Sequence, residues 1–490
     1  MTVITAGEPG LYPGRWIAMA VLLVAGFMNL IDVSIVNVAL PSMQSALGAS
    51  DSQIEWVVAA YILVFALGLL PFGRAGDIHG RRRVFTLGVG VFTFGSALCG
   101  LAPNMNALIT ARVLQGVGGA LMTPQTLAIV PTLFPPRERG LAFSLFGLAA
   151  GLASVTGPVV GGLLIHADIL GLGWRPIFLV NVPVGLIAIL AARRFVPDLP
   201  GAPGLRTDFV GVGIAGVTLL CLIAPLIEGR QLGWPLWCFA VMLAAVPLAA
   251  IFVRWQRRQN LRGRPELLPV GLLGNRNFLI GCLMVALLFS GIPGFFLVLA
   301  LYLQNGFGLI PLESGLVTVP FSVGVVVASL ISGRAGMRWP RRRISLGALL
   351  LAAAMLWLRA VVADTGEAVV WARFAPALLT GGLGLGLAVA PMFQTVLAGV
   401  SARDTGSGSG ALQSVQQVGG AFGVAMMGEI FFGRLAAGLM AGTAPHAVYA
   451  GALGIALLYN ALSFLAVAAL ARMLPRPGAA TALPAMAAHE

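Results

Sequence analysis

Charged residues are scarce in this chain, and lysine is absent from it. Charged residues make up 10% of the 490 residues, whereas hydrophobic residues make up 58%. A water-soluble globular domain has a more polar surface than this composition allows. The composition therefore excludes an ordinary soluble protein and predicts that lipid surrounds most of the chain.

Sequence patterns typical of enzymes and metal sites are also missing. The cysteines lie inside apolar stretches without metal-finger spacing; they are Cys99, Cys221, Cys238 and Cys282. The histidines are scattered over loops and tails; they are His79, His166, His446 and His489. The sequence contains neither HExxH nor GxxxxGKS/T, and no nucleophile has a histidine and an acid nearby. We therefore expect no enzyme, no ATP-driven pump, no metal site and no organic cofactor.

Short arginine runs between apolar segments determine the expected topology. Read with a window of about twenty residues, about fourteen segments are long enough to cross a bilayer, and no cleaved signal peptide is expected. Most of the 30 basic residues then fall on one face. The exceptions are Arg112 within a span and, on the other face, Arg175, Arg230, Arg359, Arg373 and Arg434. Arginine-rich short loops stay in the cytoplasm, so both termini are expected inside. The same placement explains the net charge of +13 without a nucleic-acid partner.

An internal repeat divides the chain into two halves. GRAGDIHGRRRV at Gly73–Val84 recurs as GRAGMRWPRRRI at Gly333–Ile344. We expect an all-α membrane protein made of two six-helix bundles with two extra central helices, an architecture suited to alternating access. The predicted bounds are a cytoplasmic N-terminus at 1–15, the first bundle at 16–196, the inserted helices at 207–255, a cytoplasmic linker at 256–276, the second bundle at 277–472 and a cytoplasmic tail at 473–490.

Two charged residues in the middle of spans are candidates for coupling chemistry. Asp32 lies mid-span, where a charge costs roughly 2.5 to 3.5 kcal/mol, so it should face a polar cavity and exchange protons there. Arg112 lies within the fourth span, with Gln115 one turn later on the same helical face. Asp32 is the nearest plausible acid for Arg112 if the first and fourth spans meet. The alternative is a static polar contact that only holds helices together.

Glu429 is a third candidate, near the outer end of the thirteenth span. It could take part in proton coupling or bind a cationic substrate. Because Arg434 follows five residues later, an interfacial glutamate that reaches toward water is an equally good interpretation.

The fifth span is rich in small residues around a proline. Its candidate hinge residues are Gly151, Gly157, Pro158, Gly161 and Gly162. Proline removes a backbone donor and bends a helix, while glycines permit close contact on either side of the bend. We expect a kinked, tightly packed hinge.

The first copy of the repeat is expected to form a short turn that acts as a gate loop. Its candidate residues are Gly73, Asp77, Gly80, Arg81 and Arg82. Asp77 could accept hydrogen bonds from the start of a neighbouring helix and latch one conformational state. Met337 replaces Asp77 in the second copy, so a charge-based latch would work in the first half alone. A basic loop that only fixes the topology would explain the arginines but neither Asp77 nor the glycines.

These motifs resemble those of the major facilitator superfamily, and within it the fourteen-helix drug:proton antiporters (drug:H+ antiporter family 2). GRAGDIHGRRR resembles the superfamily's loop signature, although Ala75 and Ile78 depart from it. ARVLQGVGGA resembles the fourth-helix signature, and GLASVTGPVVGG resembles the antiporter signature of the fifth helix. LIDVSIVNVALP and WRPIFLVNVPVG are similar to the first-helix and sixth-helix motifs of the fourteen-helix branch.

The resemblance implies export driven by proton influx, with Asp32 as a proton or cation site, Arg112 assisting protonation changes and Asp77 stabilising one gate. The expected partners are protons, membrane lipids and a lipophilic or cationic drug-like substrate. The expected protein is a monomer in the bacterial cytoplasmic (inner) membrane that contributes to antibiotic resistance. Export of one endogenous metabolite or lipid by the same fold is the alternative, because fold alone does not determine the substrate.

Overall fold

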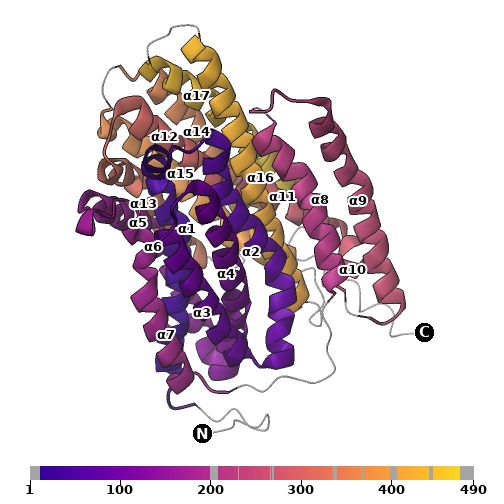
Figure 1. The fold of residues 1–490 in the computed structure, drawn as a ribbon. Helices are drawn as coiled ribbons and strands as arrows, with labels where there is room; N and C mark the ends of the chain where they lie inside the picture. The colour runs from indigo at the N-terminus through magenta and orange to yellow at the C-terminus, as the bar shows by residue number, and fades with distance from the viewer. Residues whose placement is uncertain are drawn as a thin grey trace.

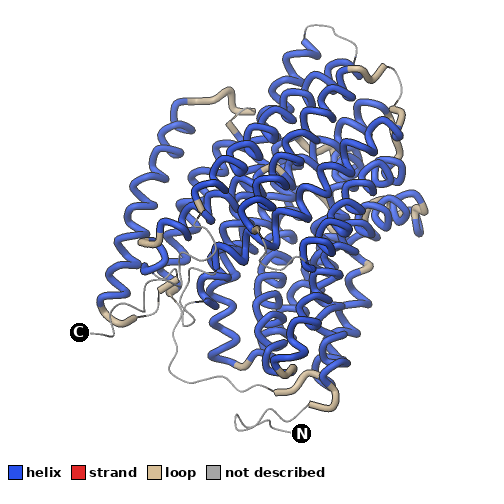
Figure 2. Tube along the Cα trace, turned by 180° about the vertical axis from the view of Figure 1, so that it is seen from behind, coloured by secondary structure: helices blue, strands red, loops and turns tan. Residues whose placement is uncertain are grey.

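The structure is a computed structural model in which the described residues form a bundle of long helices (Figures 1 and 2). It describes residues 12–198, 208–229, 231–264, 266–267, 270–334, 339–366, 369–397, 405–440 and 445–474. Within these ranges the regular structure is helical and no strand occurs. This confirms the all-α fold class, as expected where lipid leaves backbone groups no external partner.

The first half of the chain forms seven helices. They are α1 (Arg15–Leu47), α2 (Asp51–His79), α3 (Arg81–Gly100), α4 (Met105–Leu133), α5 (Pro136–His166), the short α6 (Pro176–Leu179) and α7 (Asn181–Phe195). α2 begins with a capping box, in which Ser50 and Gln53 bond each other's backbone N–H groups. Gly48 caps the end of α1, and its φ of 59° is easily adopted by glycine.

A helical hairpin follows, made of α8 (Phe209–Glu228) and α9 (Leu236–Leu261). Figure 1 shows it at one side of the molecule, with α8 between α9 and the helices α2 and α16. α9 continues to Leu261, beyond the boundary of 255 predicted for the inserted pair. Its outward face is apolar: Leu236 is 86% exposed and Leu243 is 70% exposed. Such a face fits a lipid environment and would be unusual on a soluble protein.

The remaining helices form the second half. They are α10 (Val270–Leu273), α11 (Arg276–Ser290), α12 (Ile292–Leu301), η2 (Tyr302–Gly306), α13 (Pro311–Arg334), α14 (Pro340–Ala363), α15 (Trp371–Leu397), α16 (Thr405–Met440) and α17 (Pro445–Leu470). Gly291 and Pro293 mark the junction of α11 and α12, where Asn460 donates to the Gly291 carbonyl at 3.1 Å. The two halves correspond to the predicted bundles, whose domain bounds remain predictions.

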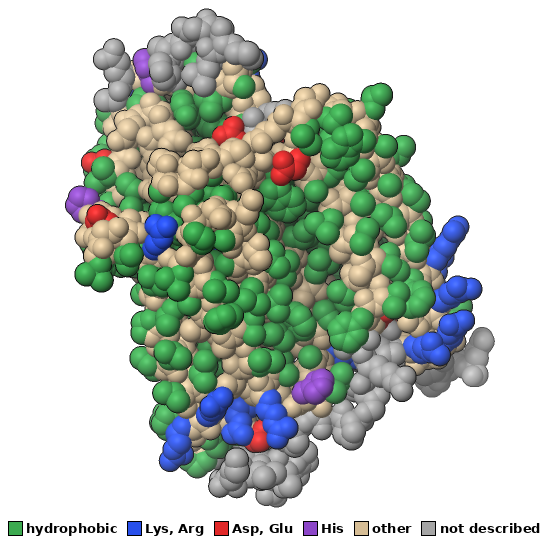
Figure 3. All heavy atoms as spheres, viewed as in Figure 1, with side chains coloured by type: hydrophobic (Ala, Val, Ile, Leu, Met, Phe, Trp, Pro, Cys, Tyr) green, Lys and Arg blue, Asp and Glu red, His purple; other side chains and the backbone are tan. Residues whose placement is uncertain are grey.

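Thirteen stretches within the described residues are long and apolar enough to cross a membrane. The remaining predicted span corresponds to α5, which has 31 residues but contributes only the shorter apolar stretch Thr156–His166. The total of fourteen therefore stays a prediction. Figure 3 shows apolar side chains across the middle of one face and most of its basic side chains near the lower edge. This distribution matches the arginine asymmetry of the sequence.

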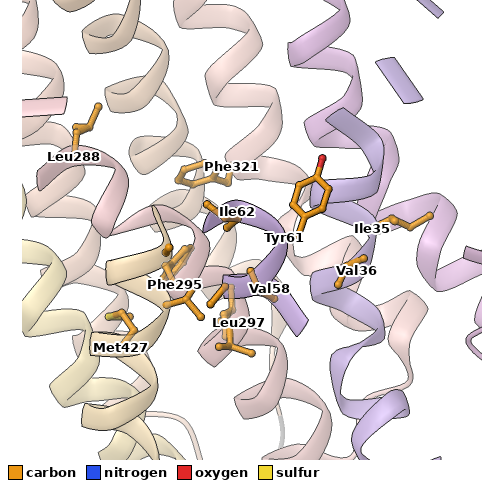
Figure 4. Close-up of a cluster of buried hydrophobic side chains, with 14 of the residues drawn as sticks. Ile35, Val36, Val58, Tyr61, Ile62, Leu288, Phe295, Leu297, Phe321 and Met427 are labelled. Atoms are coloured by element: carbon orange, nitrogen blue, oxygen red, sulfur yellow. The ribbon is translucent and has the colours of Figure 1, made fainter. Parts of the chain in front are cut away.

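The two halves share one apolar core. Figure 4 shows Ile35 on α1 and Val58, Tyr61 and Ile62 on α2 near residues of the second half. The residues of the second half in this view are Leu288 on α11, Phe295 and Leu297 on α12, Phe321 on α13 and Met427 on α16. Ile35 of this core lies on α1 close in sequence to Asp32, and Tyr61 belongs to it, so the core adjoins the candidate site.

Candidate functional site

Asp32 lies at the centre of a buried polar cluster within the first bundle. Its side chain is 0% exposed. One carboxylate oxygen accepts from Arg112 Nη1 at 2.6 Å, and the other accepts from Gln115 Nε2 at 2.7 Å and Asn181 Nδ2 at 3.2 Å. The three donors belong to α4 and α7, so the carboxylate joins α1 to two other helices. The first and fourth spans do meet, which is the condition under which Asp32 was the expected partner of Arg112.

Arg112 is held by acceptors and by an aromatic ring. It is 1% exposed, and its Nε donates to the Val57 carbonyl of α2 at 3.1 Å. Its Nη1 also donates to Gln115 Oε1 at 2.6 Å. The guanidinium carbon lies 4.1 Å from the centroid of the Tyr61 ring, a geometry that stabilises a cation. Because Arg112 has a carboxylate, two neutral oxygens and a ring around it, its charge is compensated without water.

Gln115 orients the whole cluster through its amide. Its Nε2 donates to Asp32 and to Ser96 Oγ on α3 at 2.8 Å, while its Oε1 accepts from Arg112. Cys99 Sγ also points at Oε1, at 3.7 Å. An amide with every hydrogen-bonding position occupied has one favoured orientation. Gln115 therefore links the ion pair to α3.

Four further polar residues belong to the cluster, and the sequence interpretation missed them; they are Asn29, Tyr61, Ser96 and Asn181. Asn181 on α7 also donates to Ser96 Oγ at 3.3 Å, and Tyr61 donates to Asn29 Oδ1 on α1 at 2.5 Å. Each is an uncharged polar residue in an apolar span, a pattern too common to single out a site. The available signal was the placement of Asn29 one turn before Asp32 on the same helical face.

Glycines let the helices that carry the cluster approach closely. A Cβ on Gly95 of α3 would lie 2.8 Å from the Gln115 backbone nitrogen. A Cβ on Gly116 would lie 2.8 Å from the Tyr61 carbonyl oxygen. Real Cβ atoms essentially never approach so closely, so both positions require glycine. Gly116 therefore allows α4 to pack closely against α2.

Glu429 belongs to a different contact. It accepts from Trp234 Nε1 at 3.2 Å, which joins α16 to the loop of the α8–α9 hairpin. Glu228, the last residue of α8, accepts from Trp56 Nε1 of α2 at 2.8 Å. The sequence interpretation assigned Glu228 no role, yet these two tryptophan–glutamate bonds fasten the outer end of the hairpin to both halves.

Glu55 is a buried acid that the sequence interpretation overlooked. It is 1% exposed and lies on α2, one turn beyond Asp51. A Cβ on Gly428 of α16 would lie 2.3 Å from its carboxyl carbon. The carboxyl group therefore packs against the α16 backbone, beside Glu429. The histidine, cysteine and acidic residues within the described ranges form no group of three that could hold a metal ion.

The predicted gate loop is helical, which corrects the expectation of a turn at Gly73–Arg83. Residues from Gly73 to His79 belong to α2, and α3 begins at Arg81, so Gly80 alone lies between the helices. Gly80 has φ of 92°, a value that favours glycine. Gly76 stays small for another reason: a Cβ there would lie 1.8 Å from Gln125 Oε1 on α4. The glycines thus serve helix packing and one sharp junction.

Asp77 pairs with the arginine that starts the next helix. Its Oδ1 accepts from Arg81 Nη2 at 2.5 Å across the Gly80 junction. Arg82 instead reaches Asp198 after α7, with an Nη2 to Oδ2 distance of 2.9 Å. Asp77 therefore holds its own junction together in this structure. Met337, its counterpart in the repeat, lies outside the described residues.

α5 packs against both halves through its glycines. A Cβ on Gly157 would lie 1.9 Å from Ser34 Oγ of α1, and one on Gly162 would lie 2.4 Å from Leu312 Cα of α13. α5 remains helical through Pro158, whose carbonyl oxygen lies beside Gly315. Gly151 lies in the same helix, and a Cβ on Gly161 would meet Ile35. The tight packing expected around Pro158 is present, while its action as a hinge remains a prediction.

Several contacts between the halves lie in the part of the molecule remote from the arginine-rich end, while Ser414 Oγ of α16 donates to the Ala66 carbonyl of α2 nearer the middle. Gln304 Nε2 of η2 donates to the Val38 carbonyl of α1 at 2.8 Å. The Gly162–Leu312 and Glu55–Gly428 contacts lie toward the same end. In the predicted topology this end faces outside. The described contacts therefore close the protein toward the outside.

Substituting Gly162 by alanine should disfavour this closed arrangement. The added methyl group would collide with the Leu312 backbone, which cannot move away as a side chain could. We expect spin labels at positions 45 and 310, at the outer ends of α1 and α13, to lie farther apart on average in Gly162→Ala than in the parent protein. Gly213→Ala on α8 is the matched control, because nothing lies within 4 Å of its Cβ position. Identical distance distributions in all three proteins would contradict the proposed role of this contact.

Comparison with known proteins gives one consistent family. Residues 22–424 match the profile of the Major Facilitator Superfamily. A probable actinorhodin transporter of Streptomyces coelicolor is 40% identical over 88% of this chain and 75% of its own length. A puromycin resistance protein of Streptomyces alboniger is 35% identical over 99% of this chain and 97% of its own.

Solved structures agree on the fold. A bacterial homologue of the human lysosomal transporter Spinster, crystallised in an inward-facing and occupied conformation, superimposes with a TM-score of 0.63. The match covers 95% of this chain and 97% of that one, at 17% identity. At that identity the similarity concerns the fold alone.

Proposed function

Because this chain belongs to the Major Facilitator Superfamily, we propose that it is a proton-driven antiporter that exports lipophilic or cationic small molecules by alternating access. The coarser function is established by family membership: the chain is a multi-pass membrane transporter with relatives named for antibiotic transport and resistance, and it is not an enzyme. Proton coupling and the substrate class are the parts that we propose.

The observation that carries the proposal is the burial of Asp32 among donors from two other helices. An ionised Asp32 accepts three hydrogen bonds, including one from the buried cation Arg112. Charge-assisted hydrogen bonds of this kind contribute about 1.5 to 3 kcal/mol each. The charged form of Asp32 therefore stabilises the contacts of α1 with α4 and α7.

Protonation of Asp32 would change those contacts. A neutral carboxyl group attracts Arg112 less strongly, and its new O–H must face an acceptor instead of a donor. Arg112 would then depend on Val57, Gln115 and the Tyr61 ring. A proton that binds one conformation more tightly than another shifts their populations by that difference in affinity. Asp32 thus offers a way for a proton to favour one packing of the first bundle.

Alternating access would convert this local change into transport. At the end remote from the arginines the halves meet through α5, which touches both α1 and α13. A change in the packing of α1 would therefore be transmitted through α5 to the outer end, where the two halves are in contact. The proposal uses the proton motive force as its only energy source and needs no metal or organic cofactor. Its partners are the substrate, protons and membrane lipids, and its working unit is a monomer.

The second candidate function is export of a single compound. One relative is named for a single compound, actinorhodin, and another is named as a tetracenomycin C resistance and export protein. These names favour export of one metabolite by a chain that shares 40% and 32% identity with them. Both candidates share the proton-coupling step and differ in the range of substrates.

Proteoliposomes with an imposed pH gradient test the proposal. We expect addition of a transported compound to accelerate collapse of the gradient, reported by a pH-sensitive dye in the lumen. The first compounds to test are puromycin, actinorhodin and tetracenomycin C, for which relatives are named. A response to several unrelated compounds supports broad export, whereas a response to one supports the narrower function. Compound uptake at the same rate with and without the gradient would rule out proton coupling.

A further inference from the structure

The α8–α9 hairpin encloses a cavity of about 510 Å³ that the sequence interpretation did not anticipate. Its walls come from α2, α8, α9, α11, α16 and α17. α8 contacts both α2 and α16, so the cavity continues the seam between the two halves. Its lining residues lie near the middle of these helices and toward their arginine-rich ends, and Leu267 borders it there. We call this space the hairpin chamber.

The lining of the hairpin chamber excludes charged ligands. None of the described side chains around it carries a charge, and aliphatic or aromatic residues such as Leu219, Phe252 and Phe422 dominate. The hydroxyls of Thr218 and Ser414 donate to the carbonyls of Ile214 and Ala66, so neither offers its proton to a ligand. A cation or an anion would lose its hydration there without an opposite charge in return.

One polar position distinguishes the chamber from a simple gap filled by lipid tails. Tyr459 donates its hydroxyl proton to Ser290 Oγ at 3.1 Å, and Ser290 donates to the Leu287 carbonyl at 2.9 Å. The Tyr459 oxygen retains acceptor capacity and lines the chamber. Apolar pockets of 300 to 1,000 Å³ with a few fixed polar groups are typical sites for drug-sized molecules. An acyl chain has no donor with which to use the tyrosine oxygen.

We propose that the hairpin chamber binds the transported substrate from the membrane, and that this substrate is an uncharged lipophilic molecule with a hydrogen-bond donor. This inference rests on the proposed export function and selects lipophilic over cationic substrates. The chamber touches Ala66 and Leu67 on one half and α11, α16 and α17 on the other. A bound molecule would therefore contact both halves and respond to their relative movement.

Photolabelling in lipid nanodiscs tests the binding step without any proton gradient. The probe is the neutral diazirine 3-trifluoromethyl-3-(m-iodophenyl)diazirine, with labelled residues mapped by mass spectrometry. We expect saturable labelling of Leu219 and Phe252, displaced by the neutral dye Nile red but not by the lipophilic cation tetraphenylphosphonium. Contact with bulk lipid would instead give labelling that rises linearly with probe concentration, and that result would overturn the proposal.

Two neighbouring alanines on α9 provide the variant and its control. Both are exposed, but Ala249 lines the chamber and Ala250 lies outside its lining. Ala249→Trp should fill the chamber and weaken displacement by Nile red about tenfold or more, because a bulky ring occupies the ligand's volume. Ala250→Trp should leave displacement unchanged. Equal behaviour of the two variants would refute the chamber as the binding site.

Three further measurements test this inference and separate it from the proposed function. Native mass spectrometry that finds a phospholipid retained by the parent protein and lost in Ala249→Trp would assign the chamber to lipid and overturn the inference. Tyr459→Phe should weaken displacement by a hydrogen-bond donor such as 1-naphthol and leave displacement by Nile red, which has no donor, unchanged. Saturable binding that persists when Asp32→Asn has lost proton coupling would uphold the chamber independently. Failure of proton coupling in the parent protein would refute only the proposed function.

Discussion

Asp32→Asn should abolish proton-coupled transport while the protein still folds. Asparagine has nearly the same shape as aspartate and can still accept a hydrogen bond from Arg112 or Asn181, but it cannot bind or release a proton near neutral pH. We expect substrate-evoked proton flux in proteoliposomes to fall to the level of protein-free vesicles. Size-exclusion profile and thermal transition in detergent report whether the fold is kept.

Asp364→Asn is the matched control for this substitution. The Asp364 side chain is 82% exposed and pairs with Arg373 at 3.0 Å near the outer surface. An exposed pair of this kind contributes little, so flux and thermal stability should stay unchanged. If Asp32→Asn retained the parent stoichiometry of proton flux, Asp32 would be a structural residue and the coupling site would lie elsewhere.

Arg112→Gln should destabilise the protein more strongly than any other substitution in the cluster. It leaves the Asp32 carboxylate fully buried with no cation near it, and it removes the bond to the Val57 carbonyl. Breaking a buried ion pair by removing one partner typically costs about 3 to 5 kcal/mol. We expect a marked fall in the thermal transition in detergent and in the yield of correctly folded protein.

The double substitution Asp32→Asn with Arg112→Gln identifies the cause of that loss. Removing both charges replaces the ion pair by two amides that can bond each other, so part of the stability should return. Non-additivity of this kind is expected for residues in direct contact. A double variant that is destabilised by the sum of the two single effects would show that Arg112 acts through Val57 and Tyr61 rather than through Asp32.

The sequence alone predicted the Asp32–Arg112 pair, because a charged side chain inside the membrane finds no partner in the lipid. Asp32 and Arg112 are deep within spans of the same half, and each needs an opposite charge nearby. The rest of the cluster could not be found in this way. Ser96, Asn181 and Tyr61 are polar but uncharged, and such residues in membrane helices frequently bond within their own helix or to neighbours without a functional role.

For Glu429, the sequence analysis identified the charged residue but not its partner. The sequence interpretation placed it near the outer end of a span but did not reveal its neighbour. Trp234 lies on the inserted hairpin, far away in the sequence, and its indole reaches Glu429 only because α8 packs beside α16. The participation of Glu429 in proton coupling therefore stays a prediction, and its observed bond holds the hairpin.

The sequence by itself determined that the chain crosses the membrane repeatedly, that its arginines lie on one side and that its two halves are related. The lengths of the apolar runs and the positions of the arginines are enough to show these features, because they determine how deep each segment lies along the membrane normal. They leave the rotation of each helix and the choice of its neighbours undetermined, since lipid tails and apolar side chains are similar surroundings.

Only the tertiary structure decided those remaining features. In the structure, Asn181 bonds to both Asp32 and Ser96, and α2 continues through Asp77. α8 packs against both halves, where it forms one wall of the hairpin chamber. Each depends on which helix faces meet, and that is determined by glycine contacts and buried hydrogen bonds between residues distant in the sequence.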